Sequence, residues 1–568
     1  MGTISDKLMR IINTKEDIRR ALISKGYDVP TSIPFKEYAK MILDLPCNAD
    51  SFPDIEGIVA RYSALGLTNE QMAENPVWKD LTGNGHDLQM KNFAWKGMSG
   101  VGGYGDENYQ TFYKFTLDDY VFIASPPGVK HMNFTFRVTG LQPGNKLTLA
   151  FFGTTNTVYG TWDKDGIYTV NSAVVEVGKP VYFYNGYGST RGEFTIEILP
   201  LYPGFILGDG VDDFAVTEKE LNFEDTYTVY TAFIPFQNNP TRNMILCGAD
   251  SKKTFSMQYS SLVYVSFIAG NNYYINADFV NGLNLFACKR NGNNICIKNL
   301  LTNKVVTGTC GDWVENAGLY YLWKNATYAS FAKAAIAGQT ICNGYFSTDE
   351  DDEKVLDWYK KQYPWLFPDQ AWTVTGKTNE DEDRATIANI TGNGNDLVLS
   401  NFGFIEGSGY NEEGEHAGYL VTDGVDDEVR SAAFTLNKDW TIVGNWEFIT
   451  NENKNAGLAK VYSFYLYNRD YGIFVYKYIN AGQGFSVKDV KSLKAICSDG
   501  RIYLNDWQEI RNNIEQEATI SKGVMAIGYF NRDFTKVAFK NLGIYNNQIL
   551  SKDDCIKAYN YLQTLKSK

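Results

Sequence analysis

Short apolar and aromatic runs, separated by turns rich in Gly, Asn and Asp, fill most of the chain after residue 55. Residues 136–149 (FRVTGLQPGNKLTL) show the pattern, with a strand-like run, a Pro-Gly turn and a second strand-like run. The first 46 residues differ, because Ile18, Leu22 and Ile23 fall at helical spacing after Thr14, which begins a capping-box-like sequence. The pattern therefore predicts a short helical N-terminal segment followed by a mainly β protein.

The β pattern occurs twice, and the first copy is much longer than the second. Residues 81–93 (LTGNGHDLQMKNF) match residues 390–402 (ITGNGNDLVLSNF), and a DGVDD sequence follows each, at 209–213 and at 423–427. These two landmarks lie 128 residues apart in the first copy and 33 in the second. The additional 95 residues are enough for a small domain, and exposed turns are where folds tolerate such insertions.

The repeat divides the chain into four predicted parts. Both copies end in a helix preceded by a Ser that has an acidic residue three positions later, Ser347 and Ser551. The insert has about six short strand-like runs, which is typical of an immunoglobulin-like sandwich. The predicted parts are a helical attachment segment at 1–46, a first jelly-roll domain at 55–104 plus 205–365, an inserted Ig-like domain at 106–200 and a second jelly-roll domain at 370–568.

Composition narrows the possible functions. The formal net charge of −13 argues against binding a nucleic-acid backbone, and no apolar run is long enough to span a membrane. The eight cysteines include no CxxC pair and do not repeat between the copies, so we expect buried free thiols in a reducing cytoplasm. The N-terminus does not read as a signal peptide. Modules of extracellular style without an export signal suit a virion protein, which folds in the host cytoplasm and leaves by lysis.

The DGVDD sequences have two interpretations. Asp-Gly supplies the backbone geometry of a turn, and a strand-like run follows each sequence. The alternative is a calcium site, because carboxylate oxygens are the ligands that Ca²⁺ prefers. The candidate ligands are Asp209, Asp212 and Asp213 in the first copy, and Asp423, Asp426 and Asp427 in the second.

The order of these landmarks resembles a known fold family. A Trp-x-Asp-x-TGNG-x-Asp-Leu sequence (78–88), then DGVDD, then a terminal segment (NGYF at 343–346, LGIY at 542–545) and a capped helix, is similar to concanavalin A-like, laminin-G-type jelly rolls. The second copy departs from it, with residues 384–389 (RATIAN) where the first has Trp78 and Asp80. Residues 7–42 resemble segments of virion and fibre proteins of tailed phages of Bacteroidales, including the crAss-like group. The resemblance implies a protein that decorates the capsid or tail and touches host surface polysaccharide.

Catalysis is not expected. Glycosidases of the jelly-roll superfamily carry carboxylates along one strand as E-x-D-x-x-E, and the chain has no such sequence and no other common catalytic motif. We predict no enzyme activity and no cofactor beyond the possible calcium. The alternatives are a bacterial surface glycan-binding protein or a carbohydrate-active enzyme. For glycan contact the candidates are Tyr467, Tyr471 and Tyr476, although most aromatic residues in such strands belong to the core.

The N-terminal helices are too short to be stable alone and need a partner surface. We predict that they attach the protein to other virion proteins of the capsid or tail through apolar side chains. The candidate attachment residues are Ile11, Ile18, Leu22 and Phe35. A homo-oligomer is expected, and no heptad pattern distinguishes a dimer from a trimer. The rival interpretation is a monomer whose helices cap the first domain.

Overall fold

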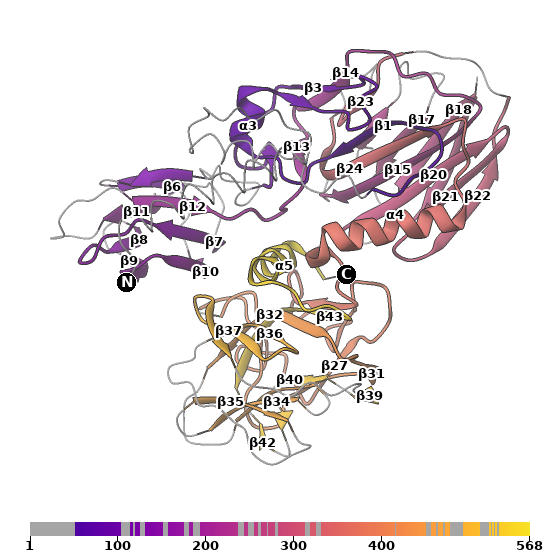
Figure 1. The fold of residues 1–568 in the computed structure, drawn as a ribbon. Coiled ribbons are helices and arrows are strands. Elements are labelled where there is room, and N and C mark those ends of the chain that lie inside the picture. Colours follow the sequence, from indigo (N-terminus) through magenta and orange to yellow (C-terminus); the bar gives the residue numbers. More distant parts are fainter. Residues whose placement is uncertain are drawn as a thin grey trace, which may run out of the picture.

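Three β-sandwiches make up the described part of the chain (Figure 1). The computed structural model describes residues 52–103, 114–117, 120–124, 131–151, 157–174, 181–185, 194–236, 243–247, 255–259, 263–269, 271–278, 282–312, 318–324, 331–414, 416–449, 456–461, 464–469, 472–477, 492–511, 522–523, 525–527, 529–530, 533–534 and 536–567. A mainly β sandwich fold was expected from the sequence, and the structure confirms it. The N-terminal helical segment lies outside the described residues.

The first module is a sandwich of two antiparallel sheets. One sheet has the order β22-β21-β20-β15-β24-β13-β4, and β1 pairs with β24 beyond the end of β13. Its strands are β1 (Ile58–Ser63), β4 (Gly100–Val101), β13 (Ile206–Asp209), β15 (Thr226–Pro235), β20 (Asn284–Asn291), β21 (Asn294–Asn299), β22 (Lys304–Thr309) and β24 (Lys333–Asn343). The second sheet has the order β19-β18-β17-β16-β23-β14-β3-β2. Its strands are β2 (Val77–Trp78), β3 (Leu88–Lys91), β14 (Phe214–Thr217), β16 (Asn243–Cys247), β17 (Phe255–Tyr259), β18 (Val263–Ala269), β19 (Asn271–Ala277) and β23 (Tyr321–Leu322).

The second module repeats this topology in every strand except β19, which has no counterpart among its described residues. Its sheets have the orders β28-β29-β43-β32-β36-β37-β38, with β25 paired to β43, and β26-β27-β30-β40-β33-β34-β35. The strands of the first sheet are β25 (Gln370–Thr373), β28 (Gly409–Tyr410), β29 (Leu420–Val421), β32 (Trp440–Phe448), β36 (Ser492–Cys497), β37 (Arg501–Leu504), β38 (Gln508–Arg511) and β43 (Val537–Asn546). Those of the second are β26 (Thr386–Ile387), β27 (Leu397–Ser400), β30 (Glu428–Ser431), β33 (Ala456–Val461), β34 (Phe464–Arg469), β35 (Gly472–Lys477) and β40 (Met525–Ile527). The duplication seen in the sequence is thus a duplication of the fold.

Two short strand pairs and two short helices complete the described elements. The pairs are β31 (Phe434–Thr435) with β39 (Lys522–Gly523), and β41 (Tyr529–Phe530) with β42 (Asp533–Phe534). Helix α3 (Asn69–Glu74) lies in the first module, and the 3₁₀ helix η2 (Pro364–Leu366) belongs to the linker between the modules.

The departure of the second copy from the Trp78 motif has a physical explanation. Register pairs Trp78 with Leu88 and Ile387 with Leu397, so a smaller side chain takes the place of the indole. Strand β25 compensates, because Trp372 stands where the first copy has Tyr62. The Tyr62 hydroxyl donates a hydrogen bond of 2.5 Å to the carbonyl of residue 86, and the Trp372 indole one of 2.9 Å to the matching carbonyl of residue 395. The large ring has changed strands while the hydrogen bond is kept.

The insert is a sandwich with its own core. Four strands form the order β10-β7-β12-β5 and four form β6-β11-β8-β9. Their bounds are β5 (Lys114–Leu117), β6 (Tyr120–Ala124), β7 (His131–Thr139), β8 (Leu147–Phe151), β9 (Thr157–Trp162), β10 (Gly166–Val174), β11 (Val181–Asn185) and β12 (Phe194–Ile198). An immunoglobulin sandwich divides seven strands as ABED and CFG, whereas this division of eight strands is that of a jelly roll. The strand order therefore differs from the immunoglobulin-like order expected from the sequence.

The two ends of the insert leave the first module side by side. Leu201 N–H donates to the carbonyl of Gly103 at 2.9 Å, and Tyr202 N–H donates to that of Gly102 at 2.7 Å. These bonds form a short stem between β4 and β13. The second copy connects the matching strands, β28 and β29, through residues 411–419.

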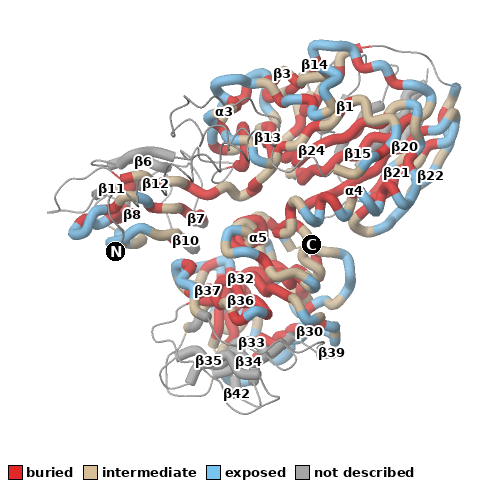
Figure 2. The backbone as a smooth tube through the Cα atoms, viewed as in Figure 1, coloured by how far each residue is buried: buried red, intermediate tan, exposed pale blue. Residues whose placement is uncertain are grey.

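Two C-terminal helices, α4 (Asp349–Gln362) and α5 (Lys552–Thr564), lie between the modules (Figure 1). Thr348 caps α4 in a capping box with Asp351, one residue after the Ser347 expected from the sequence, while Ser551 caps α5 as expected. Both helices bury apolar side chains in one cluster that draws on both modules, and their buried faces are red in Figure 2. The Tyr561 hydroxyl accepts a hydrogen bond from Leu283 N–H at 3.0 Å.

The linker and the insert also join the modules. Tyr545 of β43 donates its hydroxyl proton to the carbonyl of Trp365 in η2 at 2.8 Å. The turn after β37 contacts the insert, where the indole of Trp507 donates to the hydroxyl of Thr169 at 3.4 Å. In the first module the matching turn, after β21, instead meets the second module near Thr391. The insert therefore covers the end of the second module that corresponds to the inter-module contact of the first.

The anchor of each C-terminal helix differs between the copies. In the first copy Lys289 and Asp352, both almost fully buried, form an ion pair of 2.8 Å, and Lys298 approaches the same carboxylate at 3.1 Å. Strand register and helix position place Cys497 and Cys555 at the sites that match Lys289 and Asp352. Both thiols are buried and unoxidised. A thiol pair thus replaces a buried ion pair.

Candidate functional site

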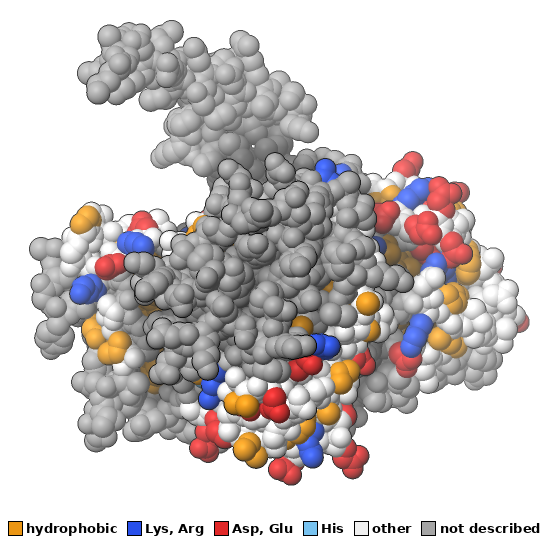
Figure 3. Space-filling view, turned by 90° about the horizontal axis from the view of Figure 1, so that it is seen from below, with side chains coloured by type: hydrophobic (Ala, Val, Ile, Leu, Met, Phe, Trp, Pro, Cys, Tyr) orange, Lys and Arg blue, Asp and Glu red, His pale blue; other side chains and the backbone are white. Residues whose placement is uncertain are grey.

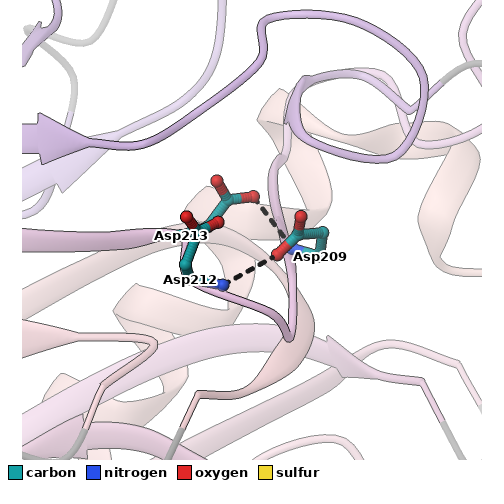
Figure 4. A group of neighbouring side chains, drawn as sticks. All are labelled: Asp209, Asp212 and Asp213. Carbon is teal, nitrogen blue, oxygen red and sulfur yellow. Dashed lines mark hydrogen bonds between the residues drawn. The ribbon is translucent and has the colours of Figure 1, made fainter. Parts of the chain in front are cut away.

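The DGVDD sequence of the first copy folds into a tight loop, called here the acidic loop (residues 209–213). One oxygen from each of Asp209, Asp212 and Asp213 lies within 4.8 Å of the others (Figure 4). Asp209 Oδ1 accepts from the N–H groups of Val211 at 2.7 Å and Asp212 at 3.4 Å, and Asp213 Oδ2 accepts from Asp209 N–H at 3.0 Å. These bonds fix the turn, as the folding interpretation of the sequence expects.

The second copy builds the same loop at residues 423–427. Asp423 Oδ1 accepts from Val425 N–H at 2.7 Å and from Asp426 N–H at 3.3 Å, and Asp427 Oδ2 accepts from Asp423 N–H at 2.7 Å. Its three carboxylates also come within 4.8 Å of one another. The three Asp residues that the sequence offers as candidate calcium ligands thus lie together in both copies, and the calcium site itself stays a prediction.

The last Asp of each loop is buried and easily protonated. Asp213 and Asp427 are 0% and 1% exposed. Burial raises the pKa of Asp213 to about 7 and that of Asp427 to about 6, although neighbouring hydrogen bonds act in the opposite direction. Asp213 Oδ1 has no hydrogen-bond partner among the described residues, whereas Asp427 Oδ1 accepts from Ser408 Oγ at 3.1 Å. A buried carboxylate oxygen without a donor is a site where a cation lowers the free energy of the ionised form.

A strained aromatic turn borders each acidic loop. We call residues 93–99 and 402–408 the aromatic hairpins. Trp95 and Phe404 occupy matching positions with φ of 54° and 51°, a left-handed conformation that is unfavourable for bulky residues. Asn92 and Asn401 each donate to the carbonyl of the second acidic-loop Asp, at 3.0 Å and 2.9 Å. Strain kept at matching positions of both copies is typical of functional sites.

The hairpins and loops together form a partly exposed patch in each module. Trp95 stacks on Phe93 with ring centroids 5.1 Å apart, and its own ring is half-buried. At the tip of the loops Val211 and Val425 are 71% and 70% exposed. The hairpins were not predicted from the sequence, although they have a matching pattern there (NFAW at 92–95, NFGF at 401–404).

The three carboxylates of each loop fit a hard divalent cation. Ca²⁺ takes six to eight oxygen ligands, so three protein oxygens leave positions for water or for the hydroxyl groups of a ligand. The residues that would hold the ion are the three Asp residues of each loop. The ion would supply a fixed positive charge that keeps the buried carboxyl ionised.

The remaining predicted site residues lie outside what the structure describes or are described in part. Ile11, Ile18, Leu22, Phe35 and Tyr471 fall outside the described residues. For Tyr467 in β34 and Tyr476 in β35 only the backbone is described, and the register of the two strands puts both positions on one face of the sheet.

A cavity of about 170 Å³ lies at the junction of the modules. Its lining includes Leu356 of α4, Ile390 and Thr391 of the second TGNG turn and Tyr561 of α5. The lining is mainly aliphatic, and its place in the shared apolar cluster makes it part of the module junction.

The charged surface is mixed. In the view of Figure 3, charged side chains of both signs are scattered over the described surface, and acidic ones gather toward the right-hand end. Among the described residues, no helix is long and apolar enough to cross a membrane.

Comparison with known proteins gives structural matches alone. No protein-family model and no curated protein matches the chain. The binding domain of botulinum neurotoxin serotype D matches with 9% identity and a TM-score of 0.28, over 61% of this chain and 88% of that domain. The binding domain of botulinum neurotoxin serotype C1 matches with 9% identity and a TM-score of 0.26, over 59% of this chain and 88% of that domain. A third match is domain 4 of AbnA, a GH43 extracellular arabinanase from Geobacillus stearothermophilus, in complex with arabinotriose. Its identity is 13% and its TM-score 0.20, over 27% of this chain and 81% of that domain. Similarity this low carries no argument about function.

Proposed function

We propose that the protein is a phage virion component, a head or tail fibre, whose two lectin-like modules contact glycans on the host surface without catalysis. The observation that carries the glycan-binding part is the duplicated patch of acidic loop and aromatic hairpin. Sugars bind proteins through stacking on aromatic faces and hydrogen bonds to carboxylate and amide groups. Each patch brings a partly buried ring, Trp95 or Phe404, into the same region as an acidic loop, because Asn92 and Asn401 bond to the loops.

The virion part of the proposal is supported by the resemblance of residues 7–42 to segments of virion and fibre proteins of Bacteroidales phages. The duplication adds a physical argument. Two equal sites on one chain raise the avidity for a polymer with repeating units by supplying the second site at high effective concentration. A repetitive surface polysaccharide is such a polymer.

The test of glycan binding is a pull-down of host surface polysaccharide by the full-length protein and by a Trp95→Ala, Phe404→Ala double variant. We expect the double variant to lose at least tenfold in apparent affinity, or about 1.4 kcal/mol, because it lacks a ring in each of the two patches. Val158→Ala, on an exposed residue of the insert, is the control. Equal binding by all three proteins would contradict the assignment of the patches.

The test of the virion assignment uses particles. Deletion of residues 1–46 should abolish incorporation of the protein into virions, because these residues carry the proposed attachment side chains. Co-sedimentation of the truncated protein with purified particles measures this. Incorporation of the truncated protein, or absence of the intact protein from virions, would show that the attachment proposal is wrong.

A further inference from the structure

Two nearly buried lysines lie on the outer face of one sheet in the second module. Lys494 of β36 is 1% exposed and Lys540 of β43 is 7% exposed. Strand β32 runs between these strands and carries Glu447, whose charge acts on both lysines. Buried lysines are rare unless they are paired, so this cluster needs an explanation.

Irregular strand pairing places both lysines. In β43, Phe539 and Asn541 pair with consecutive residues of β32, so Lys540 is an extra residue between them. In β36, Leu493 and Ala495 pair with consecutive residues of β37, so Lys494 is likewise extra. Such bulges turn a side chain away from its normal direction and are common beside active sites. Core side chains continue on the inner face while the lysines point outward.

The first copy supplies an internal comparison. It has the same bulge in β24, where Ala337 matches Lys540. Ala232 and Ile234 stand where the second copy has Asn445 and Glu447, and all three belong to the apolar cluster at the module junction. The shared fold therefore does not require polar residues at these positions, and the lysines are specific to the second module.

The charge of Glu447 acts on both lysines, and that of Asp506 acts on Lys494 as well. Asn445 donates to the Tyr419 hydroxyl at 2.9 Å, and that hydroxyl lies 3.4 Å from Glu447 Oε1. Lys494 Nζ lies 3.0 Å from the hydroxyl of Tyr559 in α5. Lys540 Nζ lies 5.4 Å from the centre of the Tyr419 ring, and the structure gives it no hydrogen bond to any described residue.

Two fully buried side-chain amides beside the lysines each have an atom that can form a further hydrogen bond. Asn541 Nδ2 and Asn445 Oδ1 have no hydrogen-bond partner among the described residues. Glu447 and His416 border the cluster on its more open side, with side chains 21% and 15% exposed. The cluster thus has an ammonium donor and an amide donor without a partner among the described residues, beside two partly exposed side chains.

We propose that this face of the second module binds the anionic group, carboxylate or sulfate, of an acidic saccharide. The anion accepts hydrogen bonds from Lys540 Nζ and Asn541 Nδ2, and its charge acts with that of Glu447 to stabilise the Lys540 ammonium group. The saccharide part of the inference rests on the proposed glycan-binding function. It adds a positively charged specificity site to the two patches of acidic loop and aromatic hairpin.

The acid–base groups that face the site give the binding a pH dependence. They are Glu447, Lys494 and Lys540 on the sheet, His416 and Tyr419 before β29, Tyr559 on α5 and Asp506 after β37. Burial lowers the pKa of both Lys494 and Lys540 to about 8. Anion binding should therefore weaken as the pH rises through 8, where the lysines lose their protons.

Calorimetric titration of the full-length protein with glucuronate, glucose 6-sulfate and glucose tests the proposal. We expect binding of one or both anionic sugars, at least tenfold weaker binding of glucose, and at least a tenfold loss in a Lys540→Met variant. Lys304→Met, which removes an exposed lysine of the first module, is the charge-matched control. A Lys494→Met variant provides a second measure if Lys540→Met does not fold.

The other possible results decide between this inference and the proposed function. No binding of either anionic sugar, or equal binding by Lys540→Met, excludes the site. Inorganic sulfate binding as tightly as glucose 6-sulfate shows an ion site without saccharide recognition. If Trp95→Ala, Phe404→Ala loses host polysaccharide while Lys540→Met retains all binding, the proposed function stands and this inference fails. If Lys540→Met loses the sugars while the double variant binds polysaccharide normally, the aromatic patches are wrong and the anion site stands.

Discussion

At the scale of single residues, the buried Asp of each acidic loop couples stability to pH. The pKa of Asp213 is about 7 in the folded protein and 3.8 in the unfolded reference, so the folded state binds more protons between these values. Stability from this group is therefore present at low pH and is lost as the pH rises through 7. Asp427, with a pKa of about 6, acts in the same direction over a narrower range.

Asp213→Asn should therefore stabilise the first module above pH 7 and have little effect near pH 4. The gain at pH 8 should be about 1–3 kcal/mol, the usual range for a buried polar atom left unsatisfied. Urea unfolding at pH 4 and pH 8 in the presence of a chelator measures it. Asp212→Asn, on an exposed residue of the same loop, is the control, and equal changes in both variants would contradict the role of burial.

A cation should reverse this pH dependence. If the acidic loops bind Ca²⁺, the ion holds Asp213 and Asp427 ionised, so it should raise the unfolding temperature more at pH 8 than at pH 5. Thermal unfolding with calcium chloride or chelator at both pH values measures the effect. No difference between calcium and chelator at pH 8 would show that the carboxylates only fix the turns.

At the scale of elements, each C-terminal helix is fastened to its sheet by a different chemistry. The first copy uses Asp352 between two lysines, and the second uses the thiols of Cys497 and Cys555. Removing one member of a buried ion pair leaves an uncompensated charge, whereas a thiol contributes mainly by packing. The two helices should therefore differ in their sensitivity to substitution at matching positions.

Asp352→Asn should destabilise the first module by about 3–5 kcal/mol, the usual effect of breaking a buried pair. Cys555→Ser, at the matching position of the second copy, should cost about 1–2 kcal/mol because a hydroxyl replaces a buried thiol. Urea unfolding followed by tryptophan fluorescence gives both values. A larger loss in Cys555→Ser than in Asp352→Asn would reverse the proposed ranking.

The contact between the modules depends on single hydrogen bonds that can be removed. Tyr561→Phe leaves the buried N–H of Leu283 without an acceptor, which should cost about 1–3 kcal/mol. We expect faster proteolytic cleavage in the linker at 364–369. Tyr62→Phe removes a bond inside the first module instead, and it should leave linker cleavage unchanged.

The sequence predicted the repeated elements well and the topology of the insert poorly. The landmarks TGNG and DGVDD predicted matching turns because turn geometry demands Gly, Asn and Asp at fixed positions. The order of strands in residues 106–200 depends on contacts distant in sequence, which local pattern does not encode. Similarly, the lysines at the bulges were invisible, because the pleat of a regular strand would have placed Lys540 in the core.

At the scale of the whole molecule, the stem of the insert predicts that the two modules fold without the insert. Because Gly102 and Gly103 are bonded directly to Tyr202 and Leu201, joining residues 103 and 199 through a short Gly-Ser linker should leave both modules folded. Circular dichroism and thermal unfolding of the protein that lacks the insert should show an unchanged fold of the modules. Aggregation of that protein would show that the insert is needed for the junction.

The contact of the insert with Trp507 has a consequence for how further copies of the module could be added to the chain. Tandem duplication extends a protein only while its last unit offers the surface on which the next unit sits. Here the insert carried by the first unit occupies that surface on the second. A third unit could therefore not sit on the second in the way that the second sits on the first while the insert occupies that surface.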